Sequence, residues 1–196
     1  MLFRIPSRHR HGADHAPAAD IRRLGLDDAS LFGRHLHDLA HEDFRDRFNG
    51  LVSDEWLDGY IARSLKHGIV LGAFDADRLV AVAELHRGID SRSGQAESAF
   101  SVLTDWRRKG LGTALIAALL VAAREDGLSD VIVETGSQNV AMKALANKFG
   151  AHMHFDGEQS TGHIDVREGL RLAADAGVAT NAAAGADEST AERRAR

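Results

Sequence analysis

One stretch of the sequence decides the fold: Ser101-Val102-Leu103-Thr104-Asp105-Trp106-Arg107-Arg108-Lys109-Gly110-Leu111-Gly112-Thr113-Ala114. It joins a predicted strand to an apolar helix that we expect from about Lys109 to Glu125. The first N–H groups of a helix have no carbonyl partner within it, and the helix dipole favours negative charge there. Glycine lets a diphosphate approach the main chain, and three adjacent cations add positive charge. The stretch therefore predicts a phosphate site, although a helix that merely begins with glycines and basic residues also fits.

Two well-known phosphate motifs do not fit this stretch. A dinucleotide-binding loop has a third glycine three residues after the second, where this sequence has Leu115. A Walker loop has Gly-Lys-Ser/Thr after four intervening residues, which the stretch lacks.

Two motifs resemble a known family. Arg107, Gly110 and Gly112 form Arg-x-x-Gly-x-Gly, which is similar to the pyrophosphate loop of the GNAT N-acetyltransferase superfamily. The segment 139–150, NVAMKALANKFG, resembles that family's Asn-x-x-Ala/Met-x-x-Leu-x-x-x-x-Gly. The order of predicted elements agrees over about residues 20–168, and segment 44–54 resembles the Arg-Phe region of bacterial Pat-like protein-lysine acetyltransferases.

Hydrophobic periodicity predicts a mixed α/β (α+β) fold. Strands are expected at 20–24, 69–74, 78–86, 97–103 and 131–134, with a closing hairpin at 151–156 and 162–167. Helices are expected from 27 or 28 to about 39, at 42–48, from 54 to about 65, at 109–125 and at 137–149. The resemblance implies a mostly antiparallel central sheet, flanked by helices, with two strands splayed apart at the acyl-CoA site.

The resemblance also implies acetyl-CoA as the acyl donor and no metal. The expected cofactor contacts are Val102, Leu103, Thr104, Arg107, Arg108, Lys109, Gly110, Leu111, Gly112, Thr113 and Asn139. The acetyl group would pass directly to an amine, without an acyl-enzyme.

A carboxylate is needed to deprotonate the amine, because an alkylammonium group has no lone pair with which to attack. Glu97, on the strand that leads to the loop, is the first candidate, and Glu84 is the second. An exposed glutamate in a cross-strand ion pair is an equally good interpretation of Glu97.

The general acid expected from the resemblance is missing. Many members have a tyrosine after the leucine of the last helix, and this chain has Ala146 there. The single tyrosine, Tyr60, has the helical spacing of a core residue. Ser137 or water could protonate the thiolate, or the thiolate could leave with solvent help alone.

Composition limits the remaining possibilities. The chain has 196 residues, 44% of them hydrophobic, no cysteine and a formal charge of -5. This excludes disulfide scaffolds and thiol nucleophiles, and disfavours nucleic acid as a partner of the Arg107–Lys109 cluster. With no apolar run of membrane-spanning length, we expect a cytoplasmic protein that does not bind membranes. Residues 1–18 and the Ala-rich residues 172–196 are expected to be disordered tails around a domain at 19–171.

Histidines are numerous, with 11 in the chain. His9, His11 and His15 could bind a metal weakly and incidentally, and His152 and His154 could line an acceptor cleft.

The sequence thus predicts an N-acetyltransferase that uses acetyl-CoA to acetylate a protein lysine or a small-molecule amine, with pairing into a homodimer as in many relatives. The alternative is a catalytically silent acyl-CoA-binding regulatory module of the same fold.

Overall fold

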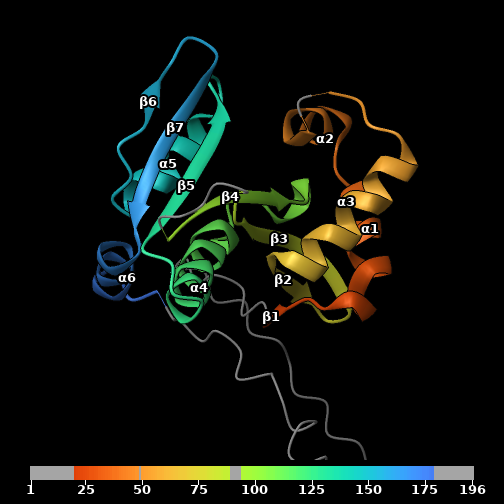
Figure 1. Cartoon of the computed structure of the whole chain (residues 1–196), viewed down its shortest axis with the longest axis horizontal. Coiled ribbons are helices and arrows are strands. Elements are labelled where there is room, and N and C mark those ends of the chain that lie inside the picture. Colours follow the sequence, from red (N-terminus) through yellow and green to blue (C-terminus); the bar gives the residue numbers. More distant parts are fainter. Residues whose placement is uncertain (1–19, 49, 89–93, 179–196) are drawn as a thin grey trace, which may run out of the picture.

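The computed structural model describes residues 20–48, 50–88 and 94–178 (Figure 1). In this part of the chain the strands form one sheet in the order β1-β2-β3-β4-β5-β7-β6. The strands are β1 (Asp20–Arg23), β2 (Ile69–Asp75), β3 (Arg78–His86), β4 (Gln95–Val102), β5 (Asp130–Gly136), β6 (His154–Phe155) and β7 (Gln159–Asp165). The helices are α1 (Ala29–His37), α2 (His41–Phe48), α3 (Asp54–His67), α4 (Leu111–Glu125), α5 (Val140–Lys148) and α6 (Val166–Asp175), with 3₁₀ turns η1 (Leu26–Asp28) and η2 (Thr104–Trp106).

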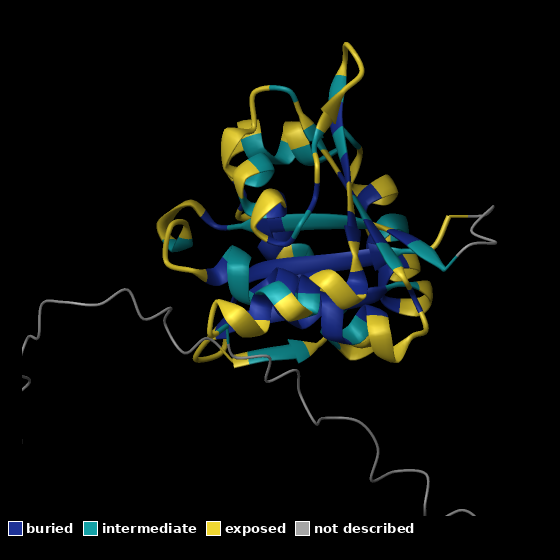
Figure 2. Ribbon diagram, turned by 90° about the vertical axis from the view of Figure 1, so that its left-hand side faces the viewer, coloured by how far each residue is buried: buried dark blue, intermediate teal, exposed yellow. Residues whose placement is uncertain are grey.

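Helices cover both faces of the sheet. α1 and α3 pack on β2 and β3 from one side, and α4 packs on β2, β3 and β4 from the other. α5 lies against β5 and β7, and α6 against α4. The middle strands β2 and β3 are buried along nearly their whole length, which is why they read as continuous apolar runs (Figure 2).

Local signals in the sequence place the helices well. The hydroxyl of Ser53 accepts a hydrogen bond from the N–H of Trp56 at 3.2 Å and caps α3 as predicted. α4 buries residues on every side because it lies between the sheet and α6. Trp56, which shares the helical spacing of core residues, is 44% exposed.

The sheet has one parallel pair, and that pair separates. β4 and β5 are paired only where Gln95–Ser98 of β4 lies beside Asp130–Val133 of β5. β4 continues from Ala99 to Val102, paired on its other side with β3, while β5 continues to Gly136, paired with β7. The two strands therefore enclose an opening. Its edge along β4 is four residues, or about 13 Å, long at about 3.3 Å per residue. The predicted mostly antiparallel sheet with a splayed strand pair is confirmed.

Helix α6 is absent from the sequence-based prediction. The carboxylate of Asp165 caps it by accepting from the N–H of Glu168 at 2.8 Å. A Cβ at Gly169 would lie 2.8 Å from side-chain carbons of Ile164 and Leu120, so small residues let the helix approach α4 closely without a large apolar side chain. The domain end expected at residue 171 therefore falls inside a packed helix in which Ala173 is buried.

The rest of the tails expected to be disordered, together with His9, His11 and His15, lies outside the described residues. Within the described ranges, no helix is both long and apolar enough to cross a bilayer.

Candidate functional site

The glycine loop lies at the wide end of the opening. After β4 ends at Val102, η2 leads into the loop, where Arg108 has a φ of 57° and Gly110 has a φ of 83°. Gly110 is the residue before the first turn of α4, so its left-handed backbone directs that turn toward the opening. Leu103 and Leu111 are buried in the core, so a ligand here can contact only their main chain.

Two of the three basic residues of the loop, Arg107 and Lys109, are already engaged. Arg107 forms an ion pair with Asp43 of α2, and its Nε donates to the carbonyl oxygen of Val102 at 3.2 Å. The ammonium group of Lys109 lies 4.6 Å from the centre of the Trp106 ring. An anion at the loop would therefore compete with Asp43 for Arg107.

Two of the predicted cofactor residues have a local structural role. A Cβ at Gly112 would lie 2.9 Å from Cδ2 of Leu145, so this glycine lets α5 pack against the start of α4. The side-chain oxygen of Asn139 accepts from the N–H of Met142 at 3.0 Å and caps α5. Asn139 is exposed at this helix end.

Glu97 lies beside the point where β4 and β5 part. It is exposed, and it is the register partner of His86 on β3 and of Ile132 on β5. Register partners project to the same face, so Glu97 and His86 share the face that α1 and α3 cover further along the sheet. Ala146 of α5, which stands where the resemblance implies a tyrosine, is fully buried.

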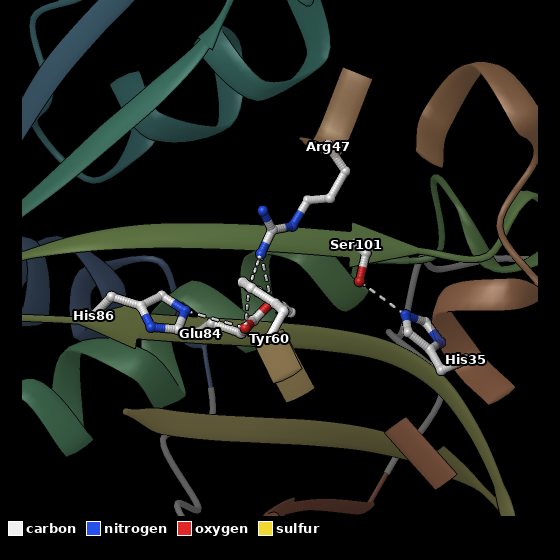
Figure 3. A network of polar contacts seen from close by, with 6 residues as sticks. All are labelled: His35, Arg47, Tyr60, Glu84, His86 and Ser101. Atoms are coloured by element: carbon white, nitrogen blue, oxygen red, sulfur yellow. Dashed lines mark hydrogen bonds and ion pairs between the residues drawn. The ribbon is translucent and has the colours of Figure 1, made fainter. Parts of the chain in front are cut away.

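Glu84 is the centre of a buried polar network (Figure 3). Its carboxylate accepts from Nη2 of Arg47 at 2.6 Å, from the hydroxyl of Tyr60 at 2.6 Å and from Nε2 of His86 at 3.1 Å. Burial by itself would raise the pKa of Glu84, but Arg47 and the hydrogen bonds from His86 and Tyr60 outweigh it and lower that pKa to about 2. A buried carboxylate with every oxygen occupied is a poor base, so the second candidate base is not supported.

Glu84 in turn shifts the pKa values of Tyr60 and Arg47. Burial and the Glu84 carboxylate raise the pKa of Tyr60, so its hydroxyl stays protonated and donates a hydrogen bond to Glu84. Burial by itself would lower the pKa of Arg47, but Glu84 reverses this and raises it. Tyr60 also lies among Phe48, Trp56 and His86, with ring centroids 5.3 to 6.0 Å away.

Sequence reasoning gave no role to four polar residues that the fold brings into buried contacts: Arg47, His86, His35 and Ser101. Arg47 and Glu84 are 37 residues apart, so no local spacing relates them. His35 of α1 and Ser101 of β4 are buried and joined by a 2.8 Å contact between Nε2 and Oγ. The Nδ1 of His35 lies 3.3 Å from the carbonyl oxygen of Leu79, and burial lowers the pKa of His35 to about 4. The ring is therefore neutral, donates from Nδ1 and accepts from the serine hydroxyl.

Other candidate features do not join the site. A hollow of about 440 Å³ is lined by Asn147, Gly150, Ala151, His152 and Met153, none of which is an expected cofactor contact. His154 is exposed on β6. The described residues contain no group of three or more side chains placed to hold a metal ion.

A parting strand pair with a glycine loop and a helix N-terminus at its wide end is the arrangement that the two sequence motifs implied. Residues 34–151 match the model of the acetyltransferase (GNAT) family. The chain belongs to this family. The predicted membership is therefore confirmed over more than half of the chain.

Solved structures of GNAT proteins share the fold. The GNAT domain of S. lividans PAT is 20% identical, with a TM-score of 0.67 over 75% of this chain and 90% of that domain. The PaiA N-acetyltransferase of Thermoplasma acidophilum, in complex with coenzyme A, is 16% identical, with a TM-score of 0.56 over 76% of this chain and 99% of that one. The putative acetyltransferase yncA of Salmonella typhimurium, with its cofactor acetyl-CoA, is 19% identical, with a TM-score of 0.59 over 76% and 95%.

Proposed function

We propose that this GNAT protein transfers the acetyl group of acetyl-CoA directly to a primary amine. The observation that carries the proposal is the opening between β4 and β5, which ends at the unpaired N–H groups of α4. The unpaired edge of β4 from Ala99 to Val102 offers main-chain groups to an extended arm. Solved relatives hold coenzyme A or acetyl-CoA, which supports the same ligand here.

The diphosphate of the cofactor would bind at the loop. The N–H groups of the first turn of α4, with Arg108 and Lys109 beside them, favour an anion at this point. The remaining assigned residues, Thr104, Gly110, Thr113 and Asn139 among them, would also contact the cofactor: Thr104 begins η2 after β4, Gly110 and Thr113 lie at the start of α4, and Asn139 precedes α5.

Glu97 would be the general base. Its carboxylate is exposed beside the narrow end of the opening, where the thioester of an extended cofactor would lie. It would take a proton from the amine as the nitrogen attacks the carbonyl carbon. The carbon–sulfur bond then breaks, and the thiolate leaves and takes a proton from water or from Ser137.

The acceptor would be a protein lysine or a small-molecule amine. The likeness to the GNAT domain of S. lividans PAT and the shared Arg-Phe segment support a protein lysine. Acidic residues on α2 and on the first half of α3 would favour a cationic acceptor: Asp43, Asp46, Asp54, Glu55 and Asp58.

Calorimetric titration of acetyl-CoA and of free CoA tests the cofactor assignment. Gly110→Glu places a side chain and a negative charge at the loop, and its φ of 83° disfavours any residue but glycine. Binding to the wild type that is lost in this variant is the expected result. Absence of binding to the wild type would overturn the proposal.

Release of free thiol in the presence of amines tests the transfer. Lysine-containing peptides, free amino acids and polyamines form a suitable panel. If the protein binds acetyl-CoA but releases no thiol with any acceptor, it is the alternative, a silent acyl-CoA-binding module. The absence of a tyrosine at position 146 is the feature that favours this alternative.

A further inference from the structure

Helix α2 runs along the opening. At its first turn, Asp43 pairs with Arg107 of the glycine loop, at the wide end. One turn later, Arg47 reaches Glu84, whose register partner on β4 is Ala99. Ala99 is the first β4 residue beyond the pairing with β5, so the guanidinium of Arg47 lies over the narrow end. Figure 3 shows it over β4, below α2.

The guanidinium of Arg47 has donors without acceptors. Both of its hydrogen bonds come from Nη2, to Glu84 and to Tyr60. Within the described residues, Nε is fully shielded and has no hydrogen-bond partner. Because Nε is fully shielded, no ligand reaches it while the side chain keeps this position. Nη1 has no hydrogen-bond partner among the described residues and is not fully shielded, so it is the donor that the oxygen of a bound ligand can meet.

The oxygen that would meet Nη1 belongs to a neutral group. Glu84 already balances the positive charge of Arg47. Exposed Glu97 on β4 and exposed Glu134 on β5 project to the same face, since Glu97 pairs with Ile132 and Glu134 lies two residues further along. A second anion from an acceptor would therefore be repelled by two carboxylates, whereas a neutral carbonyl oxygen would not be.

We propose that Arg47 donates a hydrogen bond to the acyl carbonyl oxygen of acyl-CoA bound in the opening. The inference rests on the proposed function. When the amine attacks the carbonyl carbon, the carbonyl electron pair moves to this oxygen, and a fixed cationic donor stabilises the charge that develops there. Arg47 is then a catalytic residue, and Glu84 and Tyr60 are positioning residues that hold its guanidinium.

Arg47→Lys is the informative substitution, because lysine keeps a positive charge beside Glu84 but has a single nitrogen and no planar fork. It cannot bond to Glu84 and also present a second nitrogen to a ligand. Arg22→Lys is the matched control, since Arg22 also pairs with a carboxylate, that of Asp28, at the other edge of the sheet. Three quantities are measured for the wild type and both variants: kcat, the affinities for acetyl-CoA and for free CoA, and the carbonyl stretching frequency of bound acetyl-CoA carrying carbon-13 at the carbonyl.

The expected result has three parts. Arg47→Lys lowers kcat by about 10²- to 10³-fold, the usual effect of losing one oxyanion donor. It removes a three- to tenfold preference for acetyl-CoA over free CoA that the wild type and Arg22→Lys retain. It also shifts the carbonyl band of the bound ligand to higher frequency, because a hydrogen bond weakens the carbonyl double bond. A merely structural role would leave the preference and the band unchanged.

Other outcomes overturn the inference. If the wild type transfers acetyl groups and Arg47→Lys retains kcat and the preference, Arg47 does not contact the acyl oxygen. If the variant raises KM only for acceptors that carry a carboxylate, Arg47 binds the acceptor instead. If the wild type binds no CoA, the proposed function fails rather than this assignment alone.

A second variant keeps the test possible if Arg47→Lys does not fold. The double variant of Arg47→Gln with Glu84→Gln removes both buried charges together and leaves neither one unpaired. It is compared with Glu84→Gln alone. The same loss of the acetyl-CoA preference is expected, and its retention in the double variant would overturn the assignment.

Discussion

Buried His35 should make the stability of this protein depend on pH. Its ring is 1% exposed, lies between α1 and the sheet, and has a pKa of about 4 in place of 6.5. The native state therefore keeps His35 neutral at a pH at which the unfolded chain binds a proton. Protonation would turn Nε2 into a donor, and the Ser101 hydroxyl would lose its acceptor.

The sign and size of the effect follow from these two values. A pKa lowered on folding means that the unfolded state binds more protons between pH 6.5 and pH 4, so stability is lost as the pH falls through this window. Each pH unit inside the window corresponds to about 1.36 kcal/mol. Lowering the pH from 7.5 to 5 should therefore cost about 2 kcal/mol through His35 alone, since most of the loss begins at about pH 6.5.

Urea unfolding at a series of pH values measures this contribution. The free energy of unfolding is compared between the wild type and His35→Gln, in which an amide can still bond to Ser101. His67→Gln, at the exposed end of α3, is the matched control. The wild type should lose about 2 kcal/mol more than His35→Gln between pH 7.5 and pH 5, and as much as His67→Gln. Equal losses in the wild type and His35→Gln would refute the reasoning.

Three further predictions concern the opening and the loop. Glu97→Gln should leave CoA affinity unchanged and lower kcat about 10²- to 10⁴-fold, most strongly at low pH, and steady-state kinetics with an unchanged rate would move the base elsewhere. Gly112→Ala should change the free energy of unfolding by less than about 1 kcal/mol, because the new Cβ meets only the end of the flexible Leu145 side chain, 2.9 Å away, and alanine favours the helix, and a thermal melt with a large drop in midpoint would contradict this. Asp43→Asn should raise CoA affinity by freeing Arg107 for the diphosphate, and calorimetry that shows equal or weaker binding would mean that the two do not compete.

The arrangement of α2 connects the two ends of the opening. Asp43 holds the loop cation, and Arg47 holds the carboxylate of Glu84. Both ion pairs originate from one short helix that buries no residue completely. Side chains of α2 therefore meet both the proposed diphosphate site and the proposed thioester site, although the helix contributes little to the core.

Sequence by itself determined the family, the element order and the loop. Arg107, Gly110 and Gly112 are within six residues of one another, so their pattern is a local signal, and Ser53 marks the start of α3 in the same way. Alternating and helical periodicities then located β3 and α2 to within a residue or two. α6 escapes the prediction although Val166, Leu170 and Ala173 have helical spacing, because Val166 also continues the predicted strand 162–167 and Ala173 lies in the predicted Ala-rich tail.

Only the tertiary structure decided which carboxylate is free. Glu84 and Glu97 both lie on strands before the loop, and the sequence ranks Glu97 first only because its strand leads to the loop. The fold brings Arg47, Tyr60 and His86 to Glu84 and leaves Glu97 exposed at the parting strands. Desolvation and pairing act through space, between residues from α2, α3 and β3, so the pKa of a carboxylate depends on contacts that a linear pattern does not contain.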